Sequence, residues 1–305
     1  MSLFGRLLRS AAIAAVALSA PALAEAPTVV TRFVTGGGGL PIAMSEWGPP
    51  NGRGVVLLHG AGFSKEYWTP QQNDPKLAGR YHFVSIDLRG HGASGKPWLA
   101  PDLADTNLWA ADVQAAIEAA HLDHPVIVGW SMGGYIALDY IRRYGADSIA
   151  GLMLVSSTGG LVPTLIPKGP RPGYKEAAAD LASPDLARFA RGAQEILPFM
   201  TATKLDPAQT RAWADEEMSS PLSSRMAMRG FRIDNADLAP SIRMKTLFVI
   251  GAHDAAMPAD ALAKLSKQLP QASLTIVPTA GHTVSFDDTA GFDAMLAHFV
   301  DALPR

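Results

Sequence analysis

The sequence contains no cysteine among its 305 residues. This absence excludes disulfide bonds, a thiolate nucleophile and a zinc site built on cysteine ligands. Charge is also sparse, because charged residues make up 18% of the chain and almost balance to a formal net charge of -2. No run of basic residues interleaved with aromatic residues occurs, so we predict no nucleic-acid partner. The hydrophobic share of 48% is instead typical of a globular protein with a sizeable core.

The N-terminal segment differs in composition from the rest of the chain. Arg6 and Arg9 precede an apolar stretch at 11–20, which ends at a proline and the small-residue site Ala22-Leu23-Ala24. This order is typical of a secretory signal peptide. The apolar stretch is too short to span a bilayer, so we expect no stable membrane anchor. The two arginines are not adjacent, unlike those of a twin-arginine signal. We predict that residues 1–24 are a signal peptide, cleaved after its last residue, and that the protein is periplasmic or secreted.

Short apolar runs alternate with segments of helical periodicity along most of the remaining chain. The central runs are apolar throughout, as are strands that are buried on both faces of a parallel sheet. Parallel strands are joined by right-handed crossovers, most of which contain a helix. Segments with helical spacing lie between the predicted strands, where such crossovers are required. The predicted strands are 31–34 and 41–47, which form an opening hairpin, followed by 55–58, 83–86, 125–128, 151–155, 246–250 and 273–277. We therefore predict an α/β fold with a mostly parallel sheet and helices on both faces.

Residues 158–242 interrupt this alternation. The segment begins with a proline-rich loop and continues with helical segments that include no clear strand. Ligands of open α/β sheets bind outside the carboxyl ends of the strands. We predict that the segment is a helical cap over that edge, inserted in a core formed by 25–157 and 243–305.

The pattern Gly129-Trp130-Ser131-Met132-Gly133 lies between a predicted strand and a predicted helix. A G-x-S-x-G sequence in this position is the pattern of a nucleophile elbow, in which the serine occupies a strained strand-to-helix turn. Glycine at 129 and 133 lets the helix approach the strand closely, so the hydroxyl of Ser131 stands clear of the sheet. For this segment taken alone, the alternative interpretation is a buried turn that has no catalytic role.

A serine hydroxyl is a weak nucleophile, so it requires a base and a carboxylate that orients the base. Asp254 follows the predicted strand 246–250, and His282 follows the strand 273–277. The order Ser, Asp, His is that of an α/β-hydrolase triad, and all three residues are expected at one edge of the sheet. Asp260 is a rival carboxylate, but it falls inside a predicted helix. We predict Ser131, Asp254 and His282 as the catalytic residues.

The negative charge that develops on a carbonyl oxygen requires preorganised N–H donors. We expect one donor to be the N–H of Met132, at the start of the elbow helix. The other is expected in the glycine loop after the strand 55–58, where Ala61 is preferred and Gly62 comes next. Gly62, Phe63 and Trp130 are also expected to contact the substrate.

Two further groups of polar residues precede the elbow. For His59 a structural role, in which it bonds loop backbone, is favoured over a role in the active site. Asp87, Arg89 and His91 form a charged cluster, but two ligands of mixed type without a third do not make a metal site. Ion pairs that fix the loop are the favoured explanation. We predict neither a metal ion nor a cofactor.

With these motifs the chain resembles the α/β-hydrolase superfamily, and in particular its capped serine hydrolases. The resemblance implies an eight-stranded sheet, the triad given above and the oxyanion pair Ala61 and Met132. The matching motifs cover nearly all of the chain after residue 24; they are Leu57-Leu58-His59-Gly60, Asp87 to Ser94, Gly129 to Gly134, Gly251 to Asp254, and Gly281-His282.

Comparison with the branches of this superfamily favours some reactions over others. Serine in place of aspartate at the elbow disfavours epoxide hydrolase and haloalkane dehalogenase activity. The elbow resembles those of carboxylesterases and of cofactor-free haloperoxidases or perhydrolases. The C–C bond hydrolases have an oxyanion loop rich in glycine and proline, whereas this chain has Gly-Ala-Gly-Phe.

We therefore predict an exported serine hydrolase whose partner is a small-molecule ester, of small to medium size and largely apolar. The alternatives are an acyltransferase or perhydrolase, and a lactonase, with the same triad. A C–C bond hydrolase and a binding protein without catalytic activity are less favoured. Acyl and alcohol specificity and the oligomeric state stay open.

Overall fold

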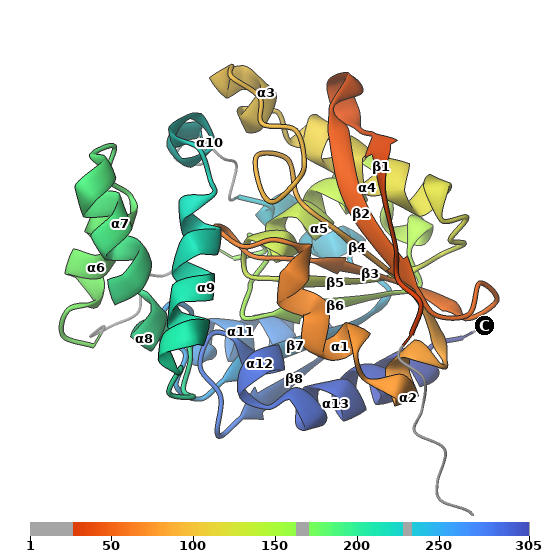
Figure 1. The fold of residues 1–305 in the computed structure, drawn as a ribbon. Coiled ribbons are helices and arrows are strands. Elements are labelled where there is room, and N and C mark those ends of the chain that lie inside the picture. Colours follow the sequence, from red (N-terminus) through yellow and green to blue (C-terminus); the bar gives the residue numbers. More distant parts are fainter. Residues whose placement is uncertain (1–26, 163–170, 228–233, 305) are drawn as a thin grey trace, which may run out of the picture.

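The computed structural model describes residues 27–162, 171–227 and 234–304. Within these ranges the chain forms an eight-stranded sheet in the order β1-β2-β4-β3-β5-β6-β7-β8 (Figure 1). The pairs β1·β2 and β2·β4 are antiparallel, and every later pair in this order is parallel. The strands are β1 (Val30–Thr35), β2 (Pro41–Trp47), β3 (Arg53–Leu58), β4 (Tyr81–Ile86), β5 (Val126–Trp130), β6 (Gly151–Val155), β7 (Lys245–Gly251) and β8 (Ala272–Val277). The predicted α/β fold with a mostly parallel sheet is therefore confirmed.

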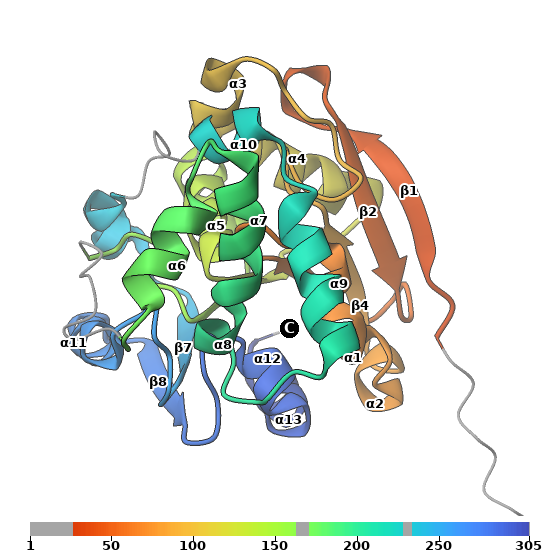
Figure 2. The same cartoon turned by 60° about the vertical axis from the view of Figure 1, so that its left-hand side comes forward.

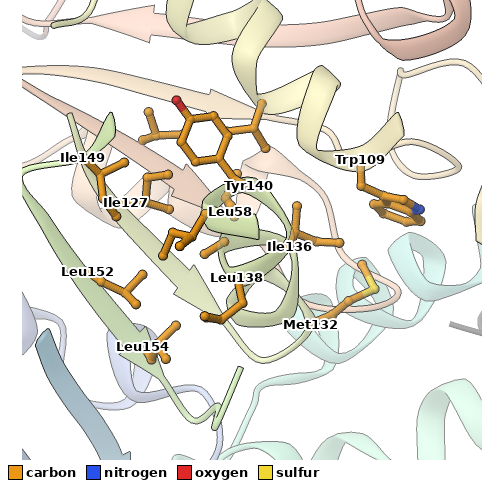
Figure 3. Close-up of a cluster of buried hydrophobic side chains, with 14 of the residues drawn as sticks. Leu58, Trp109, Ile127, Met132, Ile136, Leu138, Tyr140, Ile149, Leu152 and Leu154 are labelled. Carbon is orange, nitrogen blue, oxygen red and sulfur yellow. The ribbon is translucent and has the colours of Figure 1, made fainter. Parts of the chain in front are cut away.

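The sheet separates two hydrophobic layers, because successive residues of a strand point to opposite faces. Leu58 and Ile127 belong to the layer that is shown in Figure 3. Leu57 and Val128, their neighbours along β3 and β5, belong to the other layer. The first layer is covered by α4 (Thr106–Ala119), α5 (Met132–Tyr144) and α11 (Ala259–Gln268), and the second by α2 (Pro75–Ala78), α12 (Val284–Asp287) and α13 (Thr289–Asp301). Two more short helices, α1 (Thr69–Gln72) and α3 (Ala100–Ala104), lie in the loops around β4.

Several helices begin at an aspartate whose side chain accepts a hydrogen bond from the first turn. Asp105 accepts from the N–H of Asn107 at the start of α4. Asp206 accepts from Gln209 at the start of α9, where Pro207 occupies the first helical position. Such caps satisfy N–H groups that have no partner inside the helix, and proline suits that position because it has no N–H. Local sequence thus sets where these helices start.

The described part of 158–242 forms helices and no strand. The α-helices are α6 (Tyr174–Leu181), α7 (Leu186–Glu195), α8 (Leu197–Met200), α9 (Pro207–Met218) and α10 (Leu222–Ala227). Helices α6 to α9 form a group at the left of Figure 1, which comes to the front in Figure 2. On α9, the ring of Trp213 lies 5.4 Å from Phe63 and 4.8 Å from Phe286, so this helix covers the loops that follow β3 and β8. Helix α9 therefore lies over the carboxyl ends of β3 and β8, and the described part of 158–242 is called the cap segment below.

Two predicted features fall on parts of the chain that are not described. The predicted signal peptide, 1–24, lies outside the described residues, as does most of the proline-rich loop, at 163–170. In the described ranges, no helix has both the length and the apolar character that a membrane span requires.

Candidate active site

Ser131 lies in a strained turn between β5 and α5. Its backbone has φ 51° and ψ -115°, a conformation that costs energy for a residue with a side chain. The N–H of Ser131 donates to the carbonyl of Val155 at 2.9 Å, which ties the turn to β6. A Cβ on Gly129 would lie 2.5 Å from the carbonyl oxygen of Gly133, and a Cβ on Gly133 would overlap the backbone of Leu58. Both glycines are therefore required for the close approach of α5 to the sheet.

The structure brings Ser131, His282 and Asp254 into one hydrogen-bonded series. The Oγ of Ser131 lies 3.0 Å from Nε2 of His282. On the other side of the ring, Nδ1 lies 2.9 Å from Oδ2 and 3.0 Å from Oδ1 of Asp254. The side chains of His282 and Asp254 are 4% and 1% exposed, so water competes little for these bonds. Because Nδ1–H faces a carboxylate, Nε2 is the nitrogen that can accept the proton of the serine hydroxyl.

The carboxylate of Asp254 is fixed by the loop that follows β7. Its Oδ1 accepts hydrogen bonds from the N–H groups of Ala256 at 2.8 Å and Met257 at 2.9 Å. The rival Asp260 lies exposed in the first turn of α11. Of the two carboxylates, the structure therefore places Asp254 against the imidazole.

The loop after β3 passes beside Ser131. A Cβ on Gly60 would lie 3.2 Å from the Cβ of Ser131, and the following turn is closed by a hydrogen bond of 3.3 Å from Phe63 N–H to the Gly60 carbonyl. Ala61, at the tip of this turn, is exposed. Met132 opens α5, so its N–H has no acceptor inside the helix. Two backbone segments with available N–H groups thus flank the serine.

His59 connects two loops of the core, and its hydrogen bonds go to Gly60 and Leu88. Its Nε2 accepts the N–H of Leu88 at 2.9 Å, while Nδ1 contacts the carbonyl of Gly60 at 2.7 Å. Burial lowers the pKa of His59 well below its usual value, so the ring is neutral. These are the contacts of the structural role that the sequence favours.

The charged cluster near β4 is also structural. Arg89 and Asp112 form a bidentate pair, with N–O distances of 2.7 and 2.8 Å, that is almost completely buried. Asp87 accepts the N–H groups of Lys65 at 2.7 Å and Ala93 at 2.8 Å. Across the described residues, no group of three or more His, Asp or Glu side chains is arranged to hold a metal ion.

Gly62, Phe63 and Trp130, which we expect to contact the substrate, are all buried in this structure. Phe63 and Trp130 are 1% and 0% exposed, because their rings pack against each other inside the core. Gly62 is buried as well, and the carboxyl of Glu217 covers the position that a side chain would occupy.

Two acidic residues of α9, which no sequence motif indicates, lie on the loop after β3. Glu217 is buried against Gly62, and burial, together with the nearby Glu216, raises its pKa to about 8 despite the opposing effect of Arg225. Glu216 faces Ser64, and burial raises its pKa as well. Only the tertiary packing of α9 reveals this pair, since two adjacent glutamates on a helix are ordinarily solvated.

A cavity of about 1310 Å³ lies beside Asp254, which is one of its lining residues. Its walls include Leu197 and Thr201 from the cap segment and His253 and Met257 from the loop after β7. Neither Ser131 nor His282 is among the described residues that line it. We therefore do not propose that an ester reacts in this cavity.

Comparisons with known proteins agree with this architecture. Residues 55–294 match the model of the alpha/beta hydrolase family. A relative named as an AB hydrolase superfamily protein of Bacillus subtilis is 26% identical and covers 82% of this chain and 92% of its own. A non-heme chloroperoxidase of Burkholderia pyrrocinia is 27% identical, with 88% and 99% covered. A solved structure of a candidate aryl esterase from Burkholderia cenocepacia has a TM-score of 0.80 and 28% identity, with 89% and 98% covered.

Proposed function

Because the chain belongs to the alpha/beta hydrolase family, we propose that it is a serine hydrolase of carboxylic esters, with Ser131, His282 and Asp254 as its triad. The observation that carries this proposal is the distance of 3.0 Å between the Ser131 hydroxyl and a histidine whose other nitrogen faces a buried carboxylate. This arrangement activates a hydroxyl that is otherwise a weak nucleophile. The likeness to an esterase structure at 28% identity supports the same class of substrate.

The geometry supports a two-step mechanism. The oxygen of Ser131 attacks the ester carbonyl while Nε2 of His282 takes its proton, and His282 then returns that proton to the leaving alcohol. Asp254 holds the imidazole in the required tautomer and stabilises the imidazolium. The N–H groups of Ala61 and Met132 stabilise the oxyanion in both steps. Water then hydrolyses the acyl-enzyme by the same route.

Substrates of small to medium size and largely apolar character are part of this proposal. Perhydrolysis, in which hydrogen peroxide replaces water in the second step, is the second candidate reaction. Its support is the likeness to a non-heme chloroperoxidase and, over 136 residues at 33% identity, to a bifunctional esterase/perhydrolase of Acinetobacter calcoaceticus. A panel of esters and lactones, assayed with and without peroxide, measures how the acyl group divides between hydrolysis and transfer.

The triad is tested by single substitutions assayed on a p-nitrophenyl acyl ester and with a fluorophosphonate probe. Ser131→Ala is expected to abolish covalent labelling and to lower kcat by about 10³-fold or more. Asp254→Asn is expected to lower kcat strongly, whereas Asp260→Asn, a matched change of an exposed aspartate, leaves it unchanged. Full turnover by Ser131→Ala would overturn the proposed mechanism.

We also propose that the protein is exported after cleavage behind Ala24, as the order of residues in 1–24 indicates. The test is N-terminal sequencing of the protein recovered from the envelope of a host cell. A first residue at Glu25 is expected. Recovery of the chain with Met1 still in place contradicts export by this route.

A further inference from the structure

Trp130 connects the nucleophile to the base through the interior of the protein. It precedes Ser131 directly, and its indole Nε1–H donates a hydrogen bond of 2.8 Å to the backbone carbonyl of His282. Trp130 has no exposed surface, so no water replaces this bond. Trp130 thus links the end of β5, next to Ser131, to the loop that carries His282.

Aromatic neighbours hold the indole ring in one orientation. The ring of Tyr67 stacks on it at 3.9 Å with an angle of 6° between the planes. Phe63 meets it edge to face, with ring centroids 5.0 Å apart. At Gly60, a Cβ would lie 2.8 Å from the indole carbons. The ring therefore has no space to rotate away from the carbonyl of His282.

The stacked tyrosine is itself bound to the segment that follows the histidine. The hydroxyl of Ser285, in α12, donates to the Tyr67 oxygen at 2.7 Å, and both groups are buried. The pair Tyr67 and Trp130 therefore contacts the chain on both sides of the imidazole, at the carbonyl of His282 and three residues further on. A buried polar network of this kind favours one backbone conformation over others.

We propose that Trp130 is a positioning residue that sets the orientation of His282 relative to Ser131 through its indole N–H. This inference rests on the proposed function, because it assigns to Trp130 a part in orienting the general base. A small displacement of Nε2 weakens its hydrogen bond to the serine and lowers the rate, since catalytic groups must be held within a fraction of an ångström. A purely structural tryptophan affects stability alone.

The test is Trp130→Phe, which keeps an aromatic ring in the stack and removes the N–H. We expect kcat to fall about 10-fold to 100-fold, with KM within about twofold of the wild-type value. The acidic limb of the kcat/KM profile, which reports the base, and the downfield NMR signal of the His282 Nδ1 proton are both expected to shift.

Trp109 provides a matched control. Its Nε1–H donates a hydrogen bond of the same length, 2.8 Å, to the carbonyl of Leu103, and its side chain also has no exposed surface. Trp109 belongs to α4, and the carbonyl that it binds, that of Leu103, is not part of the proposed triad. Trp109→Phe is expected to cost a similar free energy of unfolding but to leave kcat and the pH profile unchanged.

The inference is overturned if folded Trp130→Phe keeps the wild-type kcat and pH profile, or if both Phe variants lose activity equally. If Trp130→Phe does not fold, Ser285→Ala takes its place, with an expected fall of kcat by a few fold. An unchanged kcat and NMR signal in Ser285→Ala then overturns the inference. The proposed function is judged separately, because Ser131→Ala alone decides whether this serine reacts with the fluorophosphonate.

Discussion

The carboxylate of Asp287 accepts a hydrogen bond of 2.8 Å from the N–H of Gly281, the residue that precedes His282. The same carboxylate accepts the N–H groups of Ala202 at 3.0 Å and Thr203 at 2.8 Å, in the segment between α8 and α9. It also accepts the hydroxyl of Thr201. One side chain of α12 therefore joins the cap segment to the loop that carries the proposed base.

Asp287→Asn is expected to weaken this junction, because it removes a negative charge that several donors share. The hydrogen bonds, led by that of Thr201, hold the pKa of Asp287 below its usual value of 3.8 despite partial burial. A lowered pKa contributes stability that is present above the unfolded-state pKa and is lost as the pH falls through the folded-state pKa. We expect a loss of about 1–3 kcal/mol in unfolding free energy at pH 7, which shrinks below about pH 4.

Urea denaturation at pH 7 and at pH 3 measures this difference. Asp260→Asn is the matched control, because Asp260 is exposed on α11 and makes none of these contacts. A difference between wild type and Asp287→Asn that is equally large at both pH values contradicts the assigned role of the charge.

Glu217 gives the stability of the protein a second pH dependence, of opposite sign. Burial raises its pKa from 4.5 to about 8, so the folded protein holds this proton where the unfolded chain has lost it. Stability is then complete below the unfolded-state pKa and falls as the pH rises from about 4.5 to about 8. Glu217→Gln, which cannot ionise, is expected to remove this decline, which is on the order of a few kcal/mol.

Urea denaturation at pH 5 and pH 9 tests this expectation, with the exposed Glu195 of α7 changed to Gln as the control.

The carboxylate of Glu217 also lies on the loop of Ala61, so its ionisation opposes the negative charge of the oxyanion. In wild type, kcat/KM is therefore expected to fall several-fold above about pH 8, and in Glu217→Gln it stays level. The same alkaline fall in both proteins counts against this role of Glu217.

Much of the fold and the placement of the candidate site could be predicted because the signals are local and the geometry of parallel sheets is simple. The runs that became β5 and β7 are apolar, β8 has three apolar residues among Leu274–Val277, and parallel strands place their carboxyl ends at one edge. Ser131, Asp254 and His282 each follow such a strand, so the order of the elements alone brings them to the same edge. The hydrogen-bond distances from His282 to Ser131 and from His282 to Asp254 agree with this expectation.

The directions of side chains and the contacts of the cap could not be predicted in the same way. Trp130 precedes the serine, but its partner carbonyl at His282 is 152 residues away in the sequence, and no local pattern shows that the indole turns inward. Phe63 follows a glycine loop whose turn decides which way the ring points. Glu217 belongs to a helix of mixed polarity, and only the packing of α9 against the core shows that its carboxyl is buried.

Gly62→Ala separates the two reasons for which glycine is required in the loop after β3. Gly62 has φ 76°, a conformation that costs a residue with a Cβ about 1–2 kcal/mol, and the new Cβ would overlap the carboxyl of Glu217. Gly39→Ala is the matched control, because Gly39 has φ 78° but nothing within 4 Å of the position of its Cβ. We expect Gly39→Ala to show the conformational cost alone and to keep full activity.

Gly62→Ala is expected to lose more unfolding free energy than Gly39→Ala, and to lower kcat because the displaced loop carries Ala61. Combining it with Glu217→Ala removes the overlap but not the strained φ, so the double variant should recover stability to about the level of Gly39→Ala. Urea denaturation of the variants, with esterase assays alongside, measures both effects. If Gly62→Ala costs no more than Gly39→Ala, the carboxyl of Glu217 does not restrain this loop, because a side chain held against Gly62 cannot be displaced without loss.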